Sequence, residues 1–141
     1  VLIRINFPRK VEGVTVITRD AGIFNGLAAL TRSFGSKKLE RIALVGHTHV
    51  PGVFTDEPDF YPPAEIGDSG AYKFMDDEKV IINVGSVGQP RDQDPRASYA
   101  VLHSDRVEFH RVEYDVKSTA DKIKAIPELH DWLGDRLYEG R

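Results

Sequence analysis

The sequence predicts a mixed α/β domain, with strands at its centre and helices at its periphery. Residues 42–45 (IALV) are all apolar, which is typical of a short strand buried on both faces of a sheet. Residues 14–18 (VTVIT) are rich in β-branched side chains, which favour strands. Large apolar residues at 23, 27, 30 and 34 follow a spacing of four, three and four, which is typical of one helix face. These patterns indicate one α/β unit without an internal domain boundary.

The first part of the chain is predicted to hold two strands and one helix. The strands are residues 1–5 and 14–18. Asp20 is a suitable N-cap for the helix that follows, and Gly35 and Ser36 end it. The chain does not begin with methionine, and its opening lacks the pattern of a secretion signal. We therefore expect the sequence to be a piece of a longer protein.

The middle of the chain is predicted to consist mainly of loop. The strand at residues 42–45 leads into the segment 46–52 (GHTHVPG). Residues 55–70 are acidic and rich in proline, so we expect them to form an exposed loop.

The second half of the chain is predicted to be a meander of strands followed by two helices. Ser118 and Asp121 have the spacing of a capping box, which predicts a short helix that ends before Pro127. A last helix would present one apolar face made of Leu129, Trp132, Leu133 and Leu137. The strands are expected at residues 71–75, 80–84, 98–103 and 107–114, with turns at 76–78 and 104–106 and a loop at 85–97.

The composition excludes several classes of protein. The chain has 141 residues and a formal net charge of −3, which gives no electrostatic footprint for nucleic acid. It has no apolar run of the length that spans a membrane. It has no cysteine, so disulfides, thiolate metal sites and a cysteine nucleophile are excluded. This composition suits the reducing cytosol, and we expect a cytoplasmic protein.

The clearest candidate for a functional site is the pair His47 and His49. In extended backbone, side chains two residues apart point to the same side of the chain. The pair follows a buried strand, where α/β sheets place their ligand sites, and neutral imidazole is a common ligand of zinc, iron and manganese. Gly46 removes a side chain where a close approach is needed. The alternative is a pair of surface histidines in a turn, but a second glycine-rich strand end elsewhere in the chain favours a site.

That second strand end is the segment 83–92 (NVGSVGQPRD). Gly85 allows another loop or a ligand to approach the backbone, and the amide of Asn83 can brace a neighbouring loop. Together with Ser86, these residues are our candidates for loop support. Arg91 and Arg96 are candidates for binding a substrate phosphate, because a guanidinium matches phosphate oxygens. The alternative, which we slightly favour for the arginines, is a structural turn with solvated charges.

Two of these segments resemble the calcineurin-like metallophosphoesterase superfamily. They are residues 45–54 (VGHTHVPGVF) and residues 82–103 (INVGSVGQPRDQDPRASYAVLH). The second segment is similar to a small prokaryotic branch of predicted phosphodiesterases related to diadenosine tetraphosphatases, and so is the tail at residues 107–141. The resemblance extends from residue 42 to the end of the chain.

The resemblance implies the C-terminal half of a four-layer αββα sandwich, with residues 1–141 forming a single, partial metallophosphoesterase-like domain. It also implies a site with two divalent metal ions, in which His49 would bind the first metal and His47 the second. Two such ions, roughly 3.5–4 Å apart, bind a bridging hydroxide and the phosphate oxygens. The metal is left open, because histidine suits manganese, iron, zinc and nickel. The implied substrate is a small phosphomonoester or phosphodiester, and no catalytic side chain is assigned.

The chain departs from the family pattern before Gly46. The Asp-x-His, Gly-Asp and Gly-Asn-His motifs of the family do not occur there, and no histidine precedes His47. Ile5 stands where the family usually has a metal-binding histidine. We therefore expect the remaining metal ligands to come from a preceding segment or from a second chain, such as another copy in a homo-oligomer.

Three hypotheses follow from these observations. The first is a metal-dependent phosphoesterase of which this chain holds the C-terminal part of the site. The second is a binding or scaffold module that keeps the fold without catalysis. The third is a truncated product whose exposed sheet edges drive self-association. We favour the first hypothesis for the function of the family.

Overall fold

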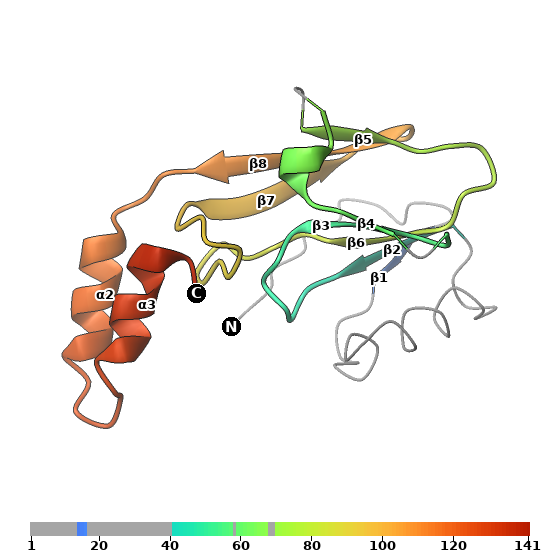
Figure 1. Cartoon of the computed structure of the whole chain (residues 1–141). Helices are drawn as coiled ribbons and strands as arrows, with labels where there is room; N and C mark the ends of the chain where they lie inside the picture. Colours follow the sequence, from blue (N-terminus) through green and yellow to red (C-terminus); the bar gives the residue numbers. More distant parts are fainter. Residues whose placement is uncertain (1–13, 17–40, 58, 68–69) are drawn as a thin grey trace.

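Two β-sheets lie one above the other, and a pair of helices extends from one end of them (Figure 1). This computed structural model describes residues 14–16, 41–57, 59–67 and 70–141. The strands are β1 Val14–Val16, β2 Ile42–Val45, β3 Gly52–Thr55, β4 Phe60–Tyr61, β5 Ala71–Lys73, β6 Val80–Asn83, β7 Ala97–Leu102 and β8 Arg106–Val112. The helices are a 3₁₀ helix Pro63–Glu65, α2 Val116–Lys124 and α3 Trp132–Glu139.

The two sheets differ in the direction of their strands. The larger sheet has the order β1-β2-β6-β3-β4, in which β1, β2 and β6 are parallel and β3 is antiparallel to both of its neighbours. The smaller sheet has the order β5-β8-β7 and is antiparallel throughout. This mixed α/β architecture agrees with the predicted fold class.

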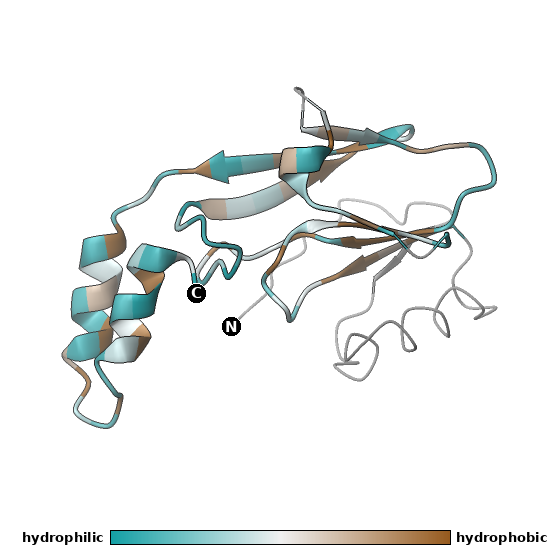
Figure 2. Cartoon of the chain, in the orientation of Figure 1, coloured by the Kyte–Doolittle hydropathy of each residue, from teal (hydrophilic) through white to brown (hydrophobic). Residues whose placement is uncertain are grey.

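The hydrophobic core lies between the two sheets. Figure 2 shows the most hydrophobic residues along β2, β3 and β6 of the larger sheet. Leu44, Val53 and Ile82 of that sheet pack with Val107 of β8, and Phe109 of the smaller sheet adds partly buried aromatic surface. All four residues of β2 are buried, including those on the opposite face of the sheet. The prediction of a strand buried on both faces is therefore confirmed.

The four strands predicted in the second half of the chain are present, with ends that differ by at most two residues from the expected ones, but the predicted meander is wrong. β6 joins the larger sheet between β2 and β3, so among these four only β7 and β8 are consecutive strands that pair. β5, β6, β7 and β8 correspond to the four strands predicted in the second half of the chain. β1 lies within the predicted strand at residues 14–18. The predicted strand at residues 1–5 and the predicted helix after Asp20 lie outside the described residues.

The segment 55–70 differs from the exposed loop that was predicted. It contains β4 and the 3₁₀ helix, and Ile66 is buried in the core. Phe60 packs on Phe54 of β3 with ring centroids 4.4 Å apart. β3 was not expected either, because its four residues (GVFT) begin with glycine and end with threonine and so lack the continuous apolar run of β2. Two contacts explain these differences: β3 pairs with β6, and Phe60 packs on Phe54. The local composition reveals neither contact.

The N-cap of α2 lies three residues before the predicted one. Asp115 is its N-cap, and the Asp115 carboxylate accepts a hydrogen bond from the Ser118 backbone N–H at 2.9 Å. The capping box that was predicted to start at Ser118 is therefore wrong. Ser118 and Asp121 both lie within the helix. Asp115 is the cap because its carboxylate reaches a free backbone N–H of the first helical turn.

The apolar face predicted for the last helix is only partly used. Leu137 of α3 is buried and Leu133 is partly buried, but Trp132 is 49% exposed. Leu129 is 39% exposed and precedes the helix. The two helices pack closely where Gly134 meets α2, because a Cβ at this position would lie 2.9 Å from the carbonyl oxygen of Ala120.

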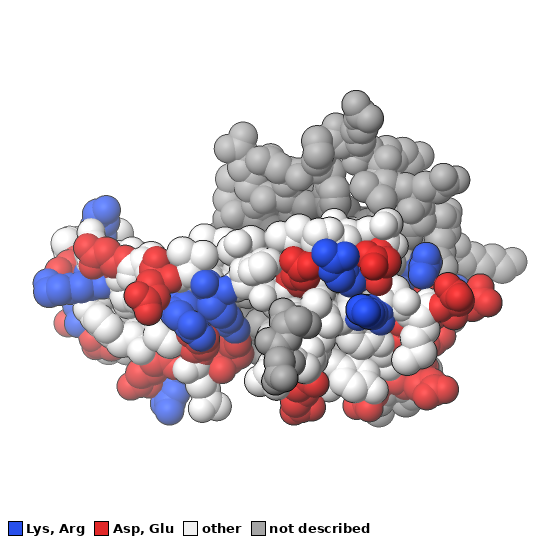
Figure 3. All heavy atoms as spheres, turned by 90° about the horizontal axis from the view of Figure 1, so that it is seen from above, with Lys and Arg blue, Asp and Glu red and all other residues white. Residues whose placement is uncertain are grey.

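The described surface carries charges of both signs. Figure 3 shows lysine and arginine interspersed with aspartate and glutamate on the face seen from above. None of the helices in the described part of the chain is long and apolar enough to cross a membrane.

Candidate functional site

The carboxyl ends of two parallel strands lie side by side at one edge of the larger sheet. The last residue of β2, Val45, pairs with the last residue of β6, Asn83. Residues 46–51 leave β2, and we call them the histidine loop. Residues 84–96 leave β6, and we call them the glycine loop. Because both loops start at the same edge, residues far apart in the sequence meet at a position where α/β sheets bind ligands.

The histidine loop crosses over the end of β6. It begins after Val45 and ends before Gly52, and both of these residues pair with Asn83 from opposite sides of β6. Asn83 is fully buried below the loop. The path of the loop is thus set by long-range pairing on both sides of one residue.

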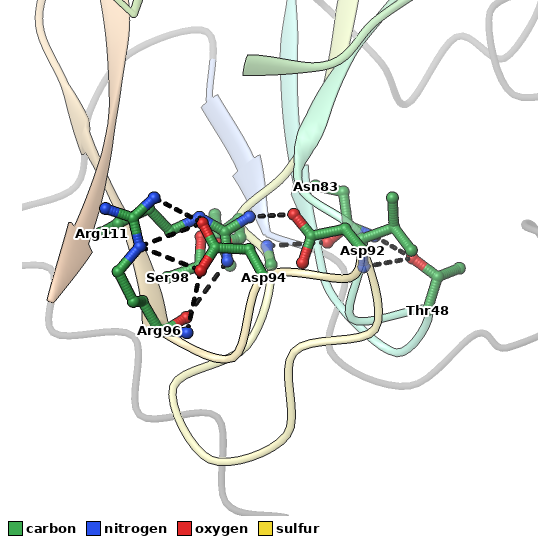
Figure 4. Close-up of polar contacts among 10 residues, drawn as sticks. Thr48, Asn83, Asp92, Asp94, Arg96, Ser98 and Arg111 are labelled. Atoms are coloured by element: carbon green, nitrogen blue, oxygen red, sulfur yellow. Dashed lines mark hydrogen bonds and ion pairs between the residues drawn. The ribbon is translucent and has the colours of Figure 1, made fainter. Parts of the chain in front are cut away.

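The Asn83 amide joins the two loops. Its Nδ2 donates hydrogen bonds to the carbonyl oxygen of Gly46 at 3.2 Å and to Oγ1 of Thr48 at 2.7 Å. Its Oδ1 accepts from the backbone N–H of Gly85 at 3.0 Å. Figure 4 shows Asn83 beside Thr48 of the histidine loop. A buried amide with both ends occupied holds a loop in one conformation.

Both histidines have a left-handed backbone, with φ of 77° at His47 and 65° at His49. The extended backbone that was predicted for this segment is therefore wrong. The loop must turn back over β6 within a few residues, and left-handed conformations allow that turn at a cost of about 1–3 kcal/mol each. The two side chains also differ in environment, since His47 is exposed and His49 is buried. Strain of this kind clusters at functional sites.

The His49 ring is held in one orientation. Its Nδ1 lies 2.8 Å from the carbonyl oxygen of Gln89 in the glycine loop. A carbonyl oxygen only accepts hydrogen bonds, so Nδ1 carries the proton and the Nε2 of a neutral ring has a free lone pair. Burial lowers the pKa of His49, against the opposing effect of the Gln89 carbonyl, and this favours the neutral ring. A neutral imidazole whose other nitrogen donates to a carbonyl is the usual state of a metal ligand.

The glycine loop is fastened below the histidine loop. The backbone N–H of Arg91 donates to the carbonyl oxygen of His49 at 3.2 Å. Ser86 is buried, its Oγ accepts from the N–H of Gln89 at 3.0 Å, and its carbonyl oxygen accepts from the N–H of Ser98 at 2.9 Å. Gln89, whose carbonyl holds the His49 ring, is therefore fixed by its own hydrogen bond to Ser86.

Gly85 occupies a position that only glycine fits. Its φ is 77°, and a Cβ there would lie 2.6 Å from Oγ of Ser98. The left-handed backbone and the close approach of β7 both exclude a side chain.

The two arginines named from the sequence have different surroundings. Arg96 binds Asp94 with two guanidinium nitrogens, at 3.0 Å from Nε and 2.6 Å from Nη2 (Figure 4). This pair lowers the pKa of the Asp94 carboxyl. Arg91 is exposed, and its guanidinium donates to Oε1 of Gln89 at 2.7 Å from Nη2. The fork of Arg96 is thus occupied by a carboxylate, whereas that of Arg91 is held by a neutral amide.

Sequence reasoning missed several residues of this region. Arg111 of β8 forms ion pairs with Asp92 and Asp94 of the glycine loop (Figure 4). An arginine two residues after Phe109, on the strand face that packs on the core, is a signal that could have found it. Gln89 holds His49 through its main-chain carbonyl, which has no signature in the sequence.

The described residues do not by themselves fit a centre of two metal ions. The histidine loop supplies two imidazoles, and no group of three or more histidine, aspartate or glutamate side chains that could hold a metal occurs in the part of the chain that the structure describes. His49 has the protonation state and the orientation of a single ligand. A complete set of ligands needs residues outside those described.

Comparison with known proteins places this architecture among the metallophosphoesterases. The metallophosphoesterase of Sphaerobacter thermophilus is 37% identical and superposes with a TM-score of 0.61 over 71% of this chain and 42% of its own. The hypothetical protein PH1004 of Pyrococcus horikoshii shares the fold alone, at 20% identity and a TM-score of 0.54, over 84% of this chain and 39% of its own.

A curated relative is also similar in sequence. The uncharacterized protein MJ0912 of Methanocaldococcus jannaschii is 39% identical over 102 residues, which are 71% of this chain and 40% of that protein. No protein-family model matches the chain.

The described chain therefore has the fold of part of a metallophosphoesterase. It spans about two fifths of the length of the proteins it matches.

Proposed function

We propose that this chain forms the histidine-loop part of the active site of a metal-dependent phosphoesterase, which hydrolyses small phosphomonoesters or phosphodiesters. His49 and His47 are the proposed metal ligands in this chain, and the remaining ligands lie outside the described residues. The proposal includes two divalent ions, with manganese among the candidates, and action in the cytoplasm. A more specific version of the proposal is that the chain belongs to the branch of predicted phosphodiesterases.

One observation carries this proposal. The His49 ring is buried at the carboxyl ends of two parallel strands, with Nδ1 bound to the carbonyl of Gln89 and Nε2 left for a metal. A histidine kept only for packing does not require a strained backbone, a neutral tautomer and a carbonyl partner together. The metallophosphoesterase neighbour supports the same reaction class.

A second candidate is a binding module with the same fold and no catalysis. It is favoured by the incomplete ligand set, since the described residues hold no group of three metal-binding side chains. The two candidates differ in whether this loop binds a metal.

The test is Mn²⁺ binding and hydrolysis by the complete protein, in which this chain is present together with the residues that supply the other ligands, and by its His49→Ala variant. Binding is read from the loss of the free Mn²⁺ signal in electron paramagnetic resonance, and activity from hydrolysis of bis(p-nitrophenyl) phosphate. His130→Ala is the matched control, because His130 is an exposed histidine outside the two loops. We expect His49→Ala to lose Mn²⁺ binding and any hydrolysis, whereas His130→Ala keeps both.

Two outcomes would contradict the phosphoesterase proposal. Equal metal binding and hydrolysis in His49→Ala and the wild type would remove His49 from the site. A protein that contains this chain together with the residues that supply the other ligands, and that binds no Mn²⁺ and hydrolyses nothing, would favour the binding module.

A further inference from the structure

We propose that Arg111 of β8 is a positioning residue of the candidate site. Arg111 belongs to the smaller sheet, whereas the histidine loop leaves the larger one. Acting through Asp92, it holds the segment of the glycine loop that fixes His49. This inference rests on the proposed function, because it concerns the orientation of a proposed metal ligand.

The glycine loop holds His49 at two points. The carbonyl oxygen of Gln89 lies 2.8 Å from Nδ1 of the His49 ring. The backbone N–H of Arg91 donates to the carbonyl oxygen of His49 at 3.2 Å. Pro90, between these two residues, is fully buried. The ring and the main chain of His49 therefore both depend on where residues 89–91 lie.

This segment is fastened at both of its ends. At its start, the N–H of Gln89 donates to Oγ of Ser86 at 3.0 Å. Directly after it, Oδ2 of Asp92 forms an ion pair with the guanidinium of Arg111 (Figure 4). Because Asp92 is bonded to Arg91 in the chain, a displacement of Asp92 is passed on to the backbone that bonds to His49.

Arg111 contacts more than one residue of the glycine loop. Besides its pair with Asp92, its Nη1 donates to the carbonyl oxygen of Arg96 at 3.2 Å, and its Nε lies 3.7 Å from Oδ2 of Asp94. The Arg111 side chain is only 15% exposed. A planar guanidinium offers several donors in a fixed arrangement, whereas a lysine offers one point charge. Arg111 thus holds this end of the loop against β8 in one position.

The Asp92 carboxylate depends on this arginine. Its side chain is 18% exposed, and its other oxygen, Oδ1, is buried without a hydrogen-bond partner among the described residues. A largely buried carboxylate that loses its counter-charge is unfavourable, so it moves towards water. Without Arg111, we expect Asp92 to turn outward and to draw the N–H of Arg91 away from His49.

Arg106 provides a matched control on the same strand. It also forms ion pairs with two carboxylates, at 2.7 Å from Nε to Glu108 and at 3.1 Å from Nη1 to Asp105. Both of these carboxylates lie outside the glycine loop. Residues an odd number of positions apart in a strand face opposite sides of the sheet, so Arg106 and Arg111 do not share a face. Loss of either arginine changes the net charge by the same amount.

The experiment is nuclear magnetic resonance of the complete protein, kept free of metal by a chelator, at about pH 8, where imidazole is neutral. Long-range ¹H–¹⁵N correlations distinguish the two tautomers of the His49 ring, and amide hydrogen exchange measures the opening of the Arg91 N–H. In Arg111→Met, we expect this amide to exchange about tenfold faster and the ring to lose its single Nδ1–H tautomer. Arg106→Met should retain the wild-type exchange rate and tautomer.

Two further variants separate positioning from a general loss of stability. Arg111→Lys keeps the charge beside Asp92 but not the planar fork, so its exchange rate should lie between those of Arg111→Met and the wild type. Adding Asp92→Asn to Arg111→Met removes the unpaired charge, and this double variant should regain slow exchange and the single tautomer. A merely structural Arg111 would lower the melting temperature without changing the His49 ring.

Several results would overturn the inference. They are a wild-type exchange rate and tautomer in Arg111→Met, an equal change in Arg106→Met, or no recovery when Asp92→Asn is added. If Arg111→Met does not fold by circular dichroism, Arg111→Lys decides the result, and a wild-type rate in that variant overturns the inference. No metal and no hydrolysis enter this measurement, so it fails or succeeds independently of the His49→Ala test.

Discussion

Asn83 is the residue on which both loops of the candidate site depend. It lies at the end of β6 and pairs with Val45 and Gly52, the two residues that flank the histidine loop. Its side chain is fully buried and bonds to Gly46, Thr48 and Gly85. Since a buried polar group left without a partner costs free energy, each of these bonds matters for stability as well as for the shape of the loop.

We expect Asn83→Ala to lower the free energy of unfolding by about 2–3 kcal/mol, because it leaves buried partners unsatisfied. Urea denaturation followed by circular dichroism measures this loss. Thr48→Val is the matched control, and we expect it to cost about 1 kcal/mol, because most of the Asn83 contacts remain. An Asn83→Ala variant that unfolds at the urea concentration of the wild type would show that the loops are held by other means.

The glycine loop is the element that connects all parts of the site. It leaves β6, supplies the carbonyl that holds His49, bonds to the end of α3 and continues into β7. Its entry requires Gly85, where the backbone is left-handed and β7 lies close. Gly88, three residues later, has no atom within 4 Å of an added Cβ. The element therefore offers one constrained and one unconstrained glycine for comparison.

We expect Gly85→Ala to destabilise the fold by about 2 kcal/mol or more, because the new methyl group meets Ser98 and the backbone is strained. Gly88→Ala should leave the free energy of unfolding within about 1 kcal/mol of the wild type. Thermal melting of the two variants side by side measures the difference. Equal melting temperatures would contradict the tight packing of the glycine loop on β7.

In the whole molecule, the site lies where the two sheets are tied together. Arg111 of β8 belongs to the smaller sheet, and it pairs with Asp92 and Asp94 of a loop that leaves the larger sheet. Arg96 completes this group of charges (Figure 4). These ion pairs connect the candidate site to the contact between the two sheets. Because acid protonates the carboxylates, the stability that the pairs contribute depends on pH.

The pKa of Asp94 is lowered, chiefly by the hydrogen bond from Arg96. A carboxyl whose pKa is lower in the folded state contributes stability above its unfolded pKa, and this contribution is lost as the pH falls through the folded value. We therefore expect the wild type to lose stability in acid, below about pH 4, and Asp94→Asn to show a shallower loss. Asp94→Asn should also be less stable than the wild type at pH 7.

Urea unfolding between pH 2 and pH 7 measures both effects. Asp76→Asn is the control for net charge, because Asp76 is exposed in the turn between β5 and β6. Parallel curves for Asp94→Asn and the wild type over this range would show that the ion group adds nothing to acid stability.

Sequence patterns were sufficient where the structure is local or strongly apolar. The segment 42–45 was recognised because four apolar residues in a row suit a strand covered on both faces, and this strand is buried throughout. The second-half strands were recognised from their composition. The cap of α2 was missed, because Asp115 and Ser118 both have suitable side chains and only the backbone path distinguishes them.

The sequence by itself determined the α/β class, most strands of the second half and the segments that form the site. These depend on side-chain type and spacing, which act over a few residues. Only the tertiary structure decided that the histidine loop crosses Asn83, that Gln89 sets the tautomer of His49, and that the end of α3 bonds to the glycine loop. These contacts join residues far apart in the chain through main-chain atoms and sheet register, which leave no periodic mark in a sequence.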